Sequence, residues 1–257
     1  MISRDLFNVM AEKAKRFKYS SMNYIDFDDC KNAEILHDGD DLILLHDKTV
    51  TPSILYFAVD DFELIVKTVA DMPDKLRLHF VPREHAASLK ELGFIEWAEF
   101  IDFWNDDISK TASRLDYQGN AEYLDKSECE EAAKILMNCE LQSRGFEGAQ
   151  MEDISDWLDQ GKILICREGS AIAGFCAISI YNEGTTLWIR VMAVDPAHQG
   201  RGIGKKLMEQ AIMYGVQNGA AKSFLAADLL NDNAIGLYEK YDFHAKDSEG
   251  ELQMIKK

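Results

Sequence analysis

The sequence predicts an α/β protein in which a mixed sheet flanked by helices is built twice along the chain. Short β-type runs alternate with amphipathic helical segments throughout the 257 residues. Residues 53–60 and 187–195 each form a β-type run that ends in Ala-Val-Asp. Only the second run leads into a glycine-rich segment, at residues 199–204. We therefore expect two copies of one fold, the first without this loop. An unrelated α+β domain in front of the second copy is the alternative.

The first copy is predicted to cover residues 1–112. Apolar side chains at helical spacing predict a helix over residues 3–18. The later elements are expected as strands at residues 22–27, 33–36, 42–45, 54–59 and 76–81, helices at 62–70 and 84–92, and a long strand at 94–104. Residues 105–113 are polar and without period, which predicts a linker between the two domains.

The second copy is predicted to cover residues 113–257. Ser127-x-x-Glu130 has the form of a capping box and predicts a helix that continues to Cys139. The elements that follow are expected as a loop or loose helix at 141–150, a helical turn at 154–158, strands at 162–167, 171–181 and 185–194, a helix at 205–216, a strand at 223–229, a helix at 233–241 and a final strand at 252–255.

The glycine-rich segment has the properties of an anion site. Gly200, Gly202 and Gly204 precede a helix whose apolar stripe includes Leu207 and Ala211. A helix start offers unpaired N–H groups and the positive end of the helix dipole, which suit phosphate. The spacing excludes the Walker and dinucleotide loops, because Lys205 stands where each of them requires its last glycine.

Two motifs carry a family resemblance. One is Gln199-x-x-Gly202-x-Gly204 after a strand that ends Val-Asp-Pro, and the other is Asn231-x-x-Ala…Leu-Tyr238-Glu-Lys-x-x-Phe243. Together, and in this order, they resemble the GNAT superfamily of acetyl-CoA-dependent N-acetyltransferases. The resemblance is strong over residues 120–257 and faint in the first half, so the chain looks like a tandem GNAT protein with a degenerate first domain. Asp242 departs from the family's usual glycine and is expected to take a left-handed conformation.

The resemblance implies a fold, a cosubstrate and a set of roles. The fold is that of two acyl-CoA N-acyltransferase domains, and acetyl-CoA is the cosubstrate. The strand backbone would pair with the pantetheine arm and polarise the thioester carbonyl, and the loop amides would hold the pyrophosphate. The implied cofactor-binding residues are Met192, Ala193, Val194, Gln199, Gly200, Arg201, Gly202, Ile203, Gly204, Lys205, Asn231, Asn233 and Tyr238.

Direct acetyl transfer to a primary amine of a small molecule or peptide is the predicted reaction. Tyr238 is the expected general acid, because a phenol is protonated at neutral pH and can donate to the leaving thiolate. Glu183, Asp228 and Glu147 remain open as the base, with the acceptor near residues 141–157. No Cys/His spacing suggests a metal. The alternative function is a non-catalytic acyl-CoA-binding regulatory protein.

Composition and charge limit the classes of partner that we expect for this protein. The formal net charge is −17, from 28 basic and 45 acidic residues, so we expect no nucleic-acid partner. No apolar run approaches the roughly 20 residues that span a bilayer. Residues 1–7 lack the order of a signal peptide, and the five cysteines form no Cys-x-x-Cys pair. We expect a cytoplasmic protein with reduced thiols that forms a monomer or a homodimer.

Overall fold

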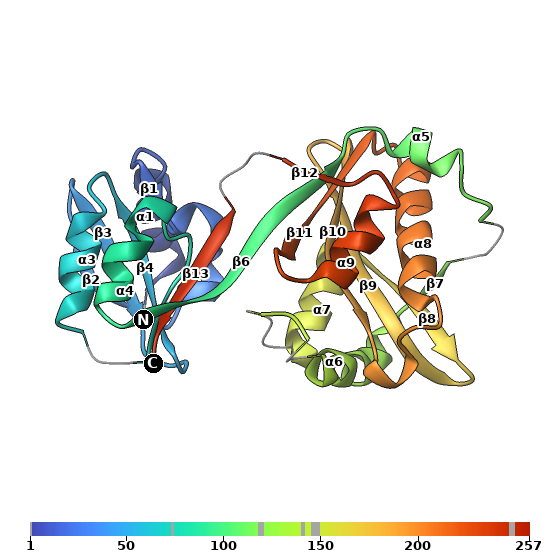
Figure 1. The fold of residues 1–257 in the computed structure, drawn as a ribbon, viewed down its shortest axis with the longest axis horizontal. Coiled ribbons are helices and arrows are strands. Elements are labelled where there is room, and N and C mark those ends of the chain that lie inside the picture. The colour runs from blue at the N-terminus through green and yellow to red at the C-terminus, as the bar shows by residue number, and fades with distance from the viewer. Residues whose placement is uncertain (1, 73–74, 118–120, 140–141, 145–149, 247–249) are drawn as a thin grey trace. The chain divides into compact units, whose positions relative to one another are not determined.

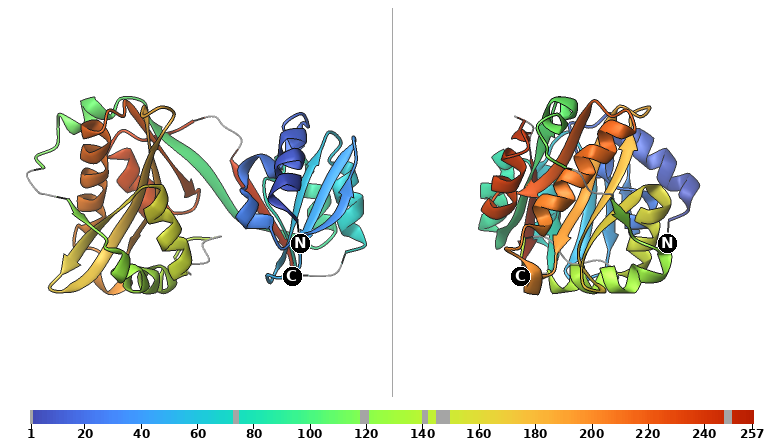
Figure 2. Two further views of the ribbon diagram at one scale, coloured as in Figure 1. Left: turned by 180° about the vertical axis from the view of Figure 1, so that it is seen from behind. Right: turned by 90° about the vertical axis from the view of Figure 1, so that its right-hand side faces the viewer.

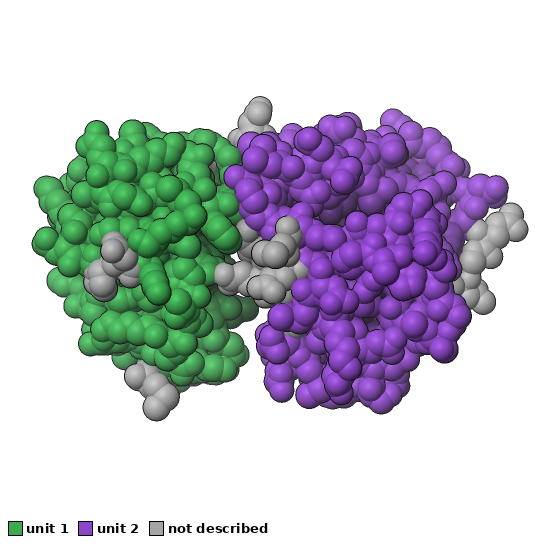
Figure 3. Space-filling view, turned by 60° about the horizontal axis from the view of Figure 1, so that its bottom comes forward, with its two compact units in different colours: residues 1–99, 250–257 green, residues 100–249 purple. Residues whose placement is uncertain are grey.

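The computed structural model describes residues 2–72, 75–117, 121–139, 142–144, 150–246 and 250–257. It contains two compact units, shown in Figure 3: Met1–Glu99 with Gly250–Lys257, and Phe100–Glu249. This division differs from the expected boundary at residue 112. The polar segment predicted to be a linker lies inside the second unit and contains a helix, α5 (Ile108–Ala112). Ile108 and Thr111 of this helix are buried.

The first unit has a mixed sheet in the order β2-β3-β4-β5-β13-β6. Within it β4 and β5 are parallel, whereas β2, β3 and β4 are antiparallel neighbours. Its elements are α1 (Arg4–Ala14), β1 (Tyr19–Ser20), η1 (Met22–Tyr24), α2 (Phe27–Cys30), β2 (Glu34–Asp38), β3 (Leu42–Asp47), β4 (Ser53–Val59), α3 (Glu63–Ala70), β5 (Leu76–Leu78), η2 (Arg83–His85), α4 (Ala86–Glu91), the first part of β6 (Phe94–Asn105), and β13 (Glu251–Lys256).

Two expectations for this unit were wrong. Residues 22–27 form a 3₁₀ turn and the start of α2 instead of a strand. The backbone N–H of Asp26 donates to the Asp29 carboxylate at 2.6 Å, which favours a helix start there. The final strand β13 belongs to the first unit, because it pairs antiparallel with β5.

The second unit has the strand order β6-β11-β10-β9-β8-β7 (Figure 1). Only β10 and β11 are parallel; the other registered neighbours along this order are antiparallel. Its further elements are β7 (Glu122–Tyr123), η3 (Lys126–Glu128), α6 (Cys129–Asn138), α7 (Met151–Gln160), β8 (Lys162–Glu168), β9 (Ala171–Tyr181), β10 (Thr186–Val194), η4 (Pro196–His198), α8 (Ile203–Gln217), β11 (Lys222–Asp228), α9 (Asp232–Glu239) and β12 (His244–Ala245).

Helices cover both faces of this sheet (Figures 1 and 2). Leu164 of β8 packs into the same apolar cluster as Leu207 of α8. Ile163 and Ile165, its neighbours on β8, pack instead with residues of α6 and α7. Successive side chains of a strand point to opposite faces, so α8 lies on one face and α6 and α7 lie on the other.

Local capping sets where α6 begins. The capping box forms between Asp125 and Glu128, not between Ser127 and Glu130 as expected. The backbone N–H of Ser127 donates to the Asp125 carboxylate at 2.9 Å, and the N–H of Asp125 donates to Glu128 at 3.0 Å.

None of the helices in the described ranges is both long and apolar enough to cross a bilayer.

Candidate functional site

A cleft opens where β10 and β11 stop pairing. Their parallel register runs from Thr186 with Lys222 to Trp188 with Phe224 and is not continued beyond that point. The register of β10 against β9 shifts between Ile189 and Val191, which marks a bulge. A bulge bends its strand and increases the local twist, so β10 can turn away from β11. Among the described residues, no pairing of β10 with β11 continues beyond Trp188.

The cleft holds a cavity of about 820 Å³. Its described lining includes residues 189–194 of β10, residues 225–228 of β11, residues of α9, and Gln199, Gly200, Gly202, Ile203 and Gly204 of the glycine-rich segment. A cavity of this volume is large enough for a small-molecule ligand. All of the described lining residues belong to the second unit.

The glycine-rich loop forms one end of the cavity. Gly200 has φ +75° and Gly202 has φ +81°, a conformation that strains other residues. A Cβ added at either position would meet open space, so both backbones can be approached closely. Gly202 is the N-cap of α8, and the N–H groups of the first turn are available there. This geometry fits an anionic group such as a pyrophosphate.

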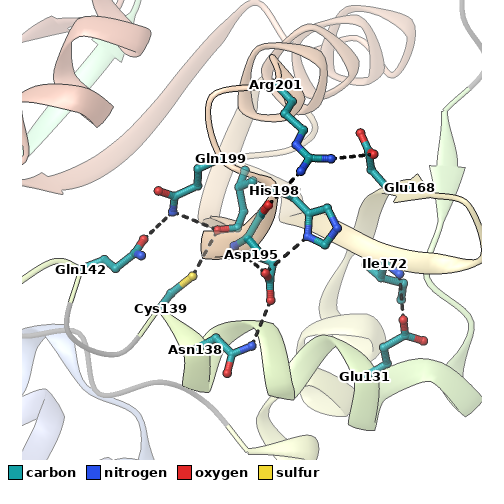
Figure 4. A network of polar contacts seen from close by, with 12 residues as sticks. Glu131, Asn138, Cys139, Gln142, Glu168, Ile172, Asp195, His198, Gln199 and Arg201 are labelled. Atoms are coloured by element: carbon teal, nitrogen blue, oxygen red, sulfur yellow. Dashed lines mark hydrogen bonds and ion pairs between the residues drawn. The ribbon is translucent and has the colours of Figure 1, made fainter.

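A network of hydrogen bonds fixes η4, which leads into this loop, to α6 (Figure 4). The Asp195 carboxylate accepts from the Ala197 N–H at 2.9 Å and from the Asn138 side-chain amide at 3.0 Å. The Asn138 contact, the largest contribution, lowers the pKa of the Asp195 carboxyl below its usual value. His198 lies 3.4 Å from the same carboxylate. The segment that leads into the loop is thus held in place before any ligand binds.

Tyr238 lies on α9 and lines the same cavity. Its helix begins at a cap in which the Asn231 side chain accepts from the Ala234 N–H at 3.2 Å. Burial raises the pKa of the Tyr238 hydroxyl above its ordinary value, with a smaller contribution from Cys176. Within the described part of the chain, no hydrogen bond to the Tyr238 hydroxyl is found. A protonated phenol is therefore available to a ligand.

Most of the predicted cofactor-binding residues come together around this cavity. The ones that line it are Met192, Ala193, Val194, Gln199, Gly200, Gly202, Ile203, Gly204, Asn231, Asn233 and Tyr238. Arg201 and Lys205 are not among the described lining residues. Arg201 contacts Glu168 at 3.1 Å, and Lys205 lies 3.8 Å from Glu209 on the exposed side of α8.

The candidate bases fall in different places. Glu183 lies in the turn between β9 and β10, is exposed, and is not among the described lining residues. Asp228 lines the cavity but is paired with Arg144, whose Nη2 lies 2.6 Å from the carboxylate. Glu147 lies outside the described residues. No group of three or more His, Cys, Asp or Glu side chains suited to a metal was found in the described ranges.

Several lining residues were not predicted as binding residues. Phe100 comes from β6, and Cys139, Gln142 and Ser143 come from the end of α6 and the segment after it. Arg190 of β10 also lines the cavity and stacks on the ring of Trp188, 4.3 Å from its centroid. No local pattern marks these positions, because they reach the cavity through tertiary packing. The alternation along β6 is the one signal that could have indicated Phe100.

Sequence comparison relates part of this unit to known proteins. Residues 130–243 match the acetyltransferase (GNAT) family. Streptothricin acetyltransferase of Streptomyces lavendulae is 32% identical over 101 residues, which are 39% of this chain and 51% of that protein. Mycothiol acetyltransferase of Catenulispora acidiphila is 25% identical over 103 residues, which are 38% of this chain and 33% of that protein. The matches thus span a half and a third of these two relatives.

Solved structures share the fold over nearly the whole chain. A GNAT-family acetyltransferase from Colwellia psychrerythraea has a TM-score of 0.59 at 10% identity and covers 100% of this chain and 97% of its own. A GCN5-related N-acetyltransferase-like protein from Streptococcus suis has a TM-score of 0.56 at 13% identity. This match covers 96% of this chain and 100% of that protein. At such identities the likeness concerns the fold alone. The sequence match covers residues 130–243, and over this segment the chain is similar to the GNAT family of acetyltransferases.

Proposed function

We propose that this protein transfers an acetyl group from acetyl-CoA to a primary amine of a small molecule or peptide. One observation carries the proposal: the diverging strands β10 and β11, the glycine loop at the start of α8 and Tyr238 all line one cavity. A strand edge, an anion site and a proton donor are the three parts that such a transfer needs. The GNAT match of residues 130–243 supports the same reaction.

Acetyl-CoA fits the cavity as an extended ligand. Its pantetheine arm would lie along β10 at Met192, Ala193 and Val194, beyond the residues that pair with β11, as an added strand does. Its pyrophosphate would lie at the N–H groups of residues 199–205. Arg201 and Lys205 would add positive charge at the rim, and Asn231 and Asn233 would donate nearer the reactive end.

The acceptor amine would attack the thioester carbonyl directly. A C–N bond would form and the C–S bond would break. The nitrogen would lose a proton to water, and the leaving thiolate would take the Tyr238 proton, which water would then restore. The raised pKa of Tyr238 keeps this proton in place at neutral pH. Backbone N–H groups of β10 would stabilise the oxyanion. Glu183 remains a candidate base only through ordered water, since it is exposed at the hairpin turn.

The first unit is proposed to be a second, degenerate copy of the same fold. In each unit three antiparallel strands are followed by a helix and then by a strand parallel to the third. The first unit has this pattern in β2, β3, β4, α3 and β5, and the second has it in β8, β9, β10, α8 and β11. Such agreement in order and direction supports a tandem origin of the two units.

A segment of the first unit fills the place where a cofactor arm would lie. Among the described residues, β4 pairs with β5 at Ser53–Leu55, and farther along the same edge Val59 and Ala58 pair with Tyr19 and Ser20 of β1. The Phe57 carbonyl accepts from the Ser21 N–H at 2.9 Å, and the Phe57 N–H donates to the Ser21 hydroxyl at 2.9 Å. With this edge occupied and no glycine loop after Asp60, we infer one acetyl-CoA per chain.

Calorimetry with acetyl-CoA and a screen of amines for CoA release test the proposed function together. We expect micromolar affinity, about −8 kcal/mol, with a stoichiometry of one. Release of CoA in the presence of one amine class identifies the acceptor. Binding without release for any amine would instead support the non-catalytic acyl-CoA-binding alternative. No heat at millimolar acetyl-CoA would reject both functions.

A further inference from the structure

Three residues, Gln142–Arg144, cross the cleft from the side of β10 to the side of β11. Gln142 is hydrogen-bonded at the β10 side, and Arg144 is hydrogen-bonded at the β11 side. Ser143, between them, lines the cavity. We call this segment the strap. Apart from Tyr238, Ser143 carries the one hydroxyl among the described lining residues.

The β10 end of the strap is tied to the cofactor loop (Figure 4). The Gln199 amide donates to the Gln142 side-chain oxygen at 2.5 Å and to the Val194 carbonyl at 3.1 Å. The Cys139 thiol contacts the same carbonyl at 3.4 Å. One glutamine of the loop therefore joins the strap to the strand that the pantetheine arm would follow.

The β11 end is held by an ion pair with a buried carboxylate. The Arg144 guanidinium donates from Nε at 3.2 Å and from Nη2 at 2.6 Å to the Asp228 carboxylate, and the Arg144 backbone N–H donates at 3.2 Å. Asp228 is 3% exposed and also accepts from the Leu230 N–H at 3.3 Å. A two-point contact from a planar guanidinium fixes direction as well as distance.

We propose that Gln142 and Arg144 are positioning residues that hold Ser143 against the pantetheine arm of acetyl-CoA. The inference rests on the proposed function, because it assigns the cavity to acetyl-CoA. Both ends of the strap are held by interactions that exist in the ligand-free protein. Acetyl-CoA therefore meets an ordered wall, and the entropy of ordering the strap is not lost on binding.

Substitution of Arg144 tests whether the strap acts on the pantetheine arm or on the nucleotide end of acetyl-CoA. Arg144→Ala should weaken acetyl-CoA binding about tenfold, because the strap is no longer ordered before binding. Adenosine 3′,5′-bisphosphate, a fragment without the pantetheine arm, should bind Arg144→Ala as it binds the wild type. Gln142→Ala should show the same selectivity. Calorimetry with both ligands on the full chain measures these affinities.

A second substitution distinguishes a positioning role of Arg144 from a contribution of Arg144 to the stability of the fold. Arg144→Ala leaves the Asp228 carboxylate buried without its partner, which lowers the denaturation midpoint. Asp228→Asn added to Arg144→Ala removes that charge and should restore the midpoint, yet acetyl-CoA affinity should stay about tenfold reduced. Arg114→Ala is the matched control, because it breaks an arginine–aspartate pair with Asp242, neither residue of which lines this cavity.

The possible outcomes are distinguishable. If the wild type does not bind acetyl-CoA, the proposed function fails and the strap has no ligand to position. If the wild type binds and both strap variants bind within twofold of it, the strap proposal is overturned while the proposed function stands. Equal losses for acetyl-CoA and the bisphosphate overturn it as well, since they would indicate general damage to the cleft.

Discussion

The Thr111 hydroxyl donates a 2.6 Å hydrogen bond to the Asp242 carboxylate. Asp242 follows α9 and has φ +61°, the left-handed conformation expected from the sequence. Arg114 donates to the same carboxylate. Asp242 thus serves to hold α5 against the turn after α9. The polar segment that suggested a linker is polar because its side chains bind within the unit.

Thr111→Val should destabilise the protein by about 1–3 kcal/mol, because it leaves the Asp242 side chain with fewer partners at a half-buried site. Thr111 also accepts from the Asn105 amide at 2.8 Å, so a second group loses a partner. Chemical denaturation measures the change. Ser109→Ala, at an exposed position of the same helix, is the control. Equal stability of the two variants would contradict a structural role for the Thr111 bond.

The sequence predicted the parts of this fold that are encoded locally. The apolar stripe of α8, including Leu207 and Ala211, and the glycine loop before it are set by spacing along one segment. The partner of β13 could not be predicted, because strand pairing over such a separation leaves no local pattern. Gln142 was not predicted either, because its role comes from its contact with Gln199, which lies 57 residues away in the sequence.

Gly202→Val should abolish acetyl-CoA binding. Valine at φ +81° is strained, and relief of that strain would move the N–H groups that start α8. A side chain would also fill the open space beside the backbone where the pyrophosphate is proposed to bind. Calorimetry with acetyl-CoA measures the loss. Retained affinity would show that the pyrophosphate binds elsewhere.

Gly219→Val provides the matched control for Gly202→Val. Gly219 lies just beyond the other end of α8, has φ +89°, and is not among the described residues that line the cavity. Valine there carries a comparable backbone strain, of order 1–3 kcal/mol. The two variants should therefore lose similar stability, while Gly219→Val keeps its affinity for acetyl-CoA.

The free energy of unfolding should depend on pH through the Asp195 carboxyl, whose pKa is lowered mainly by its hydrogen bond with Asn138. The folded pKa of Asp195 is lowered, so the carboxylate stabilises the folded state above its unfolded pKa of about 4 and loses that contribution as pH falls through the folded pKa. Asn138→Ala removes the largest cause of the lowering. Its free energy of unfolding should then fall less between pH 6 and pH 3 than that of the wild type. Identical pH dependence in urea denaturation would exclude this linkage.

Tyr238→Phe should retain acetyl-CoA affinity and lower kcat by about 10²–10⁴, because only the proton donor is removed. The packing of the ring is preserved: its centroid lies 6.2 Å from Phe103 and 6.5 Å from Phe243. Full turnover in this variant would assign the proton to another group.

The pH profile of kcat tests the same assignment independently. A general acid acts only while protonated, and burial raises the pKa of Tyr238 above the usual value of about 10. The wild-type kcat should therefore show no alkaline decline from this group below about pH 10. The deprotonation of the acceptor amine acts in the opposite direction, since it raises the rate as pH increases. A fall in kcat with an apparent pKa near 8 would mean that a different residue supplies the proton.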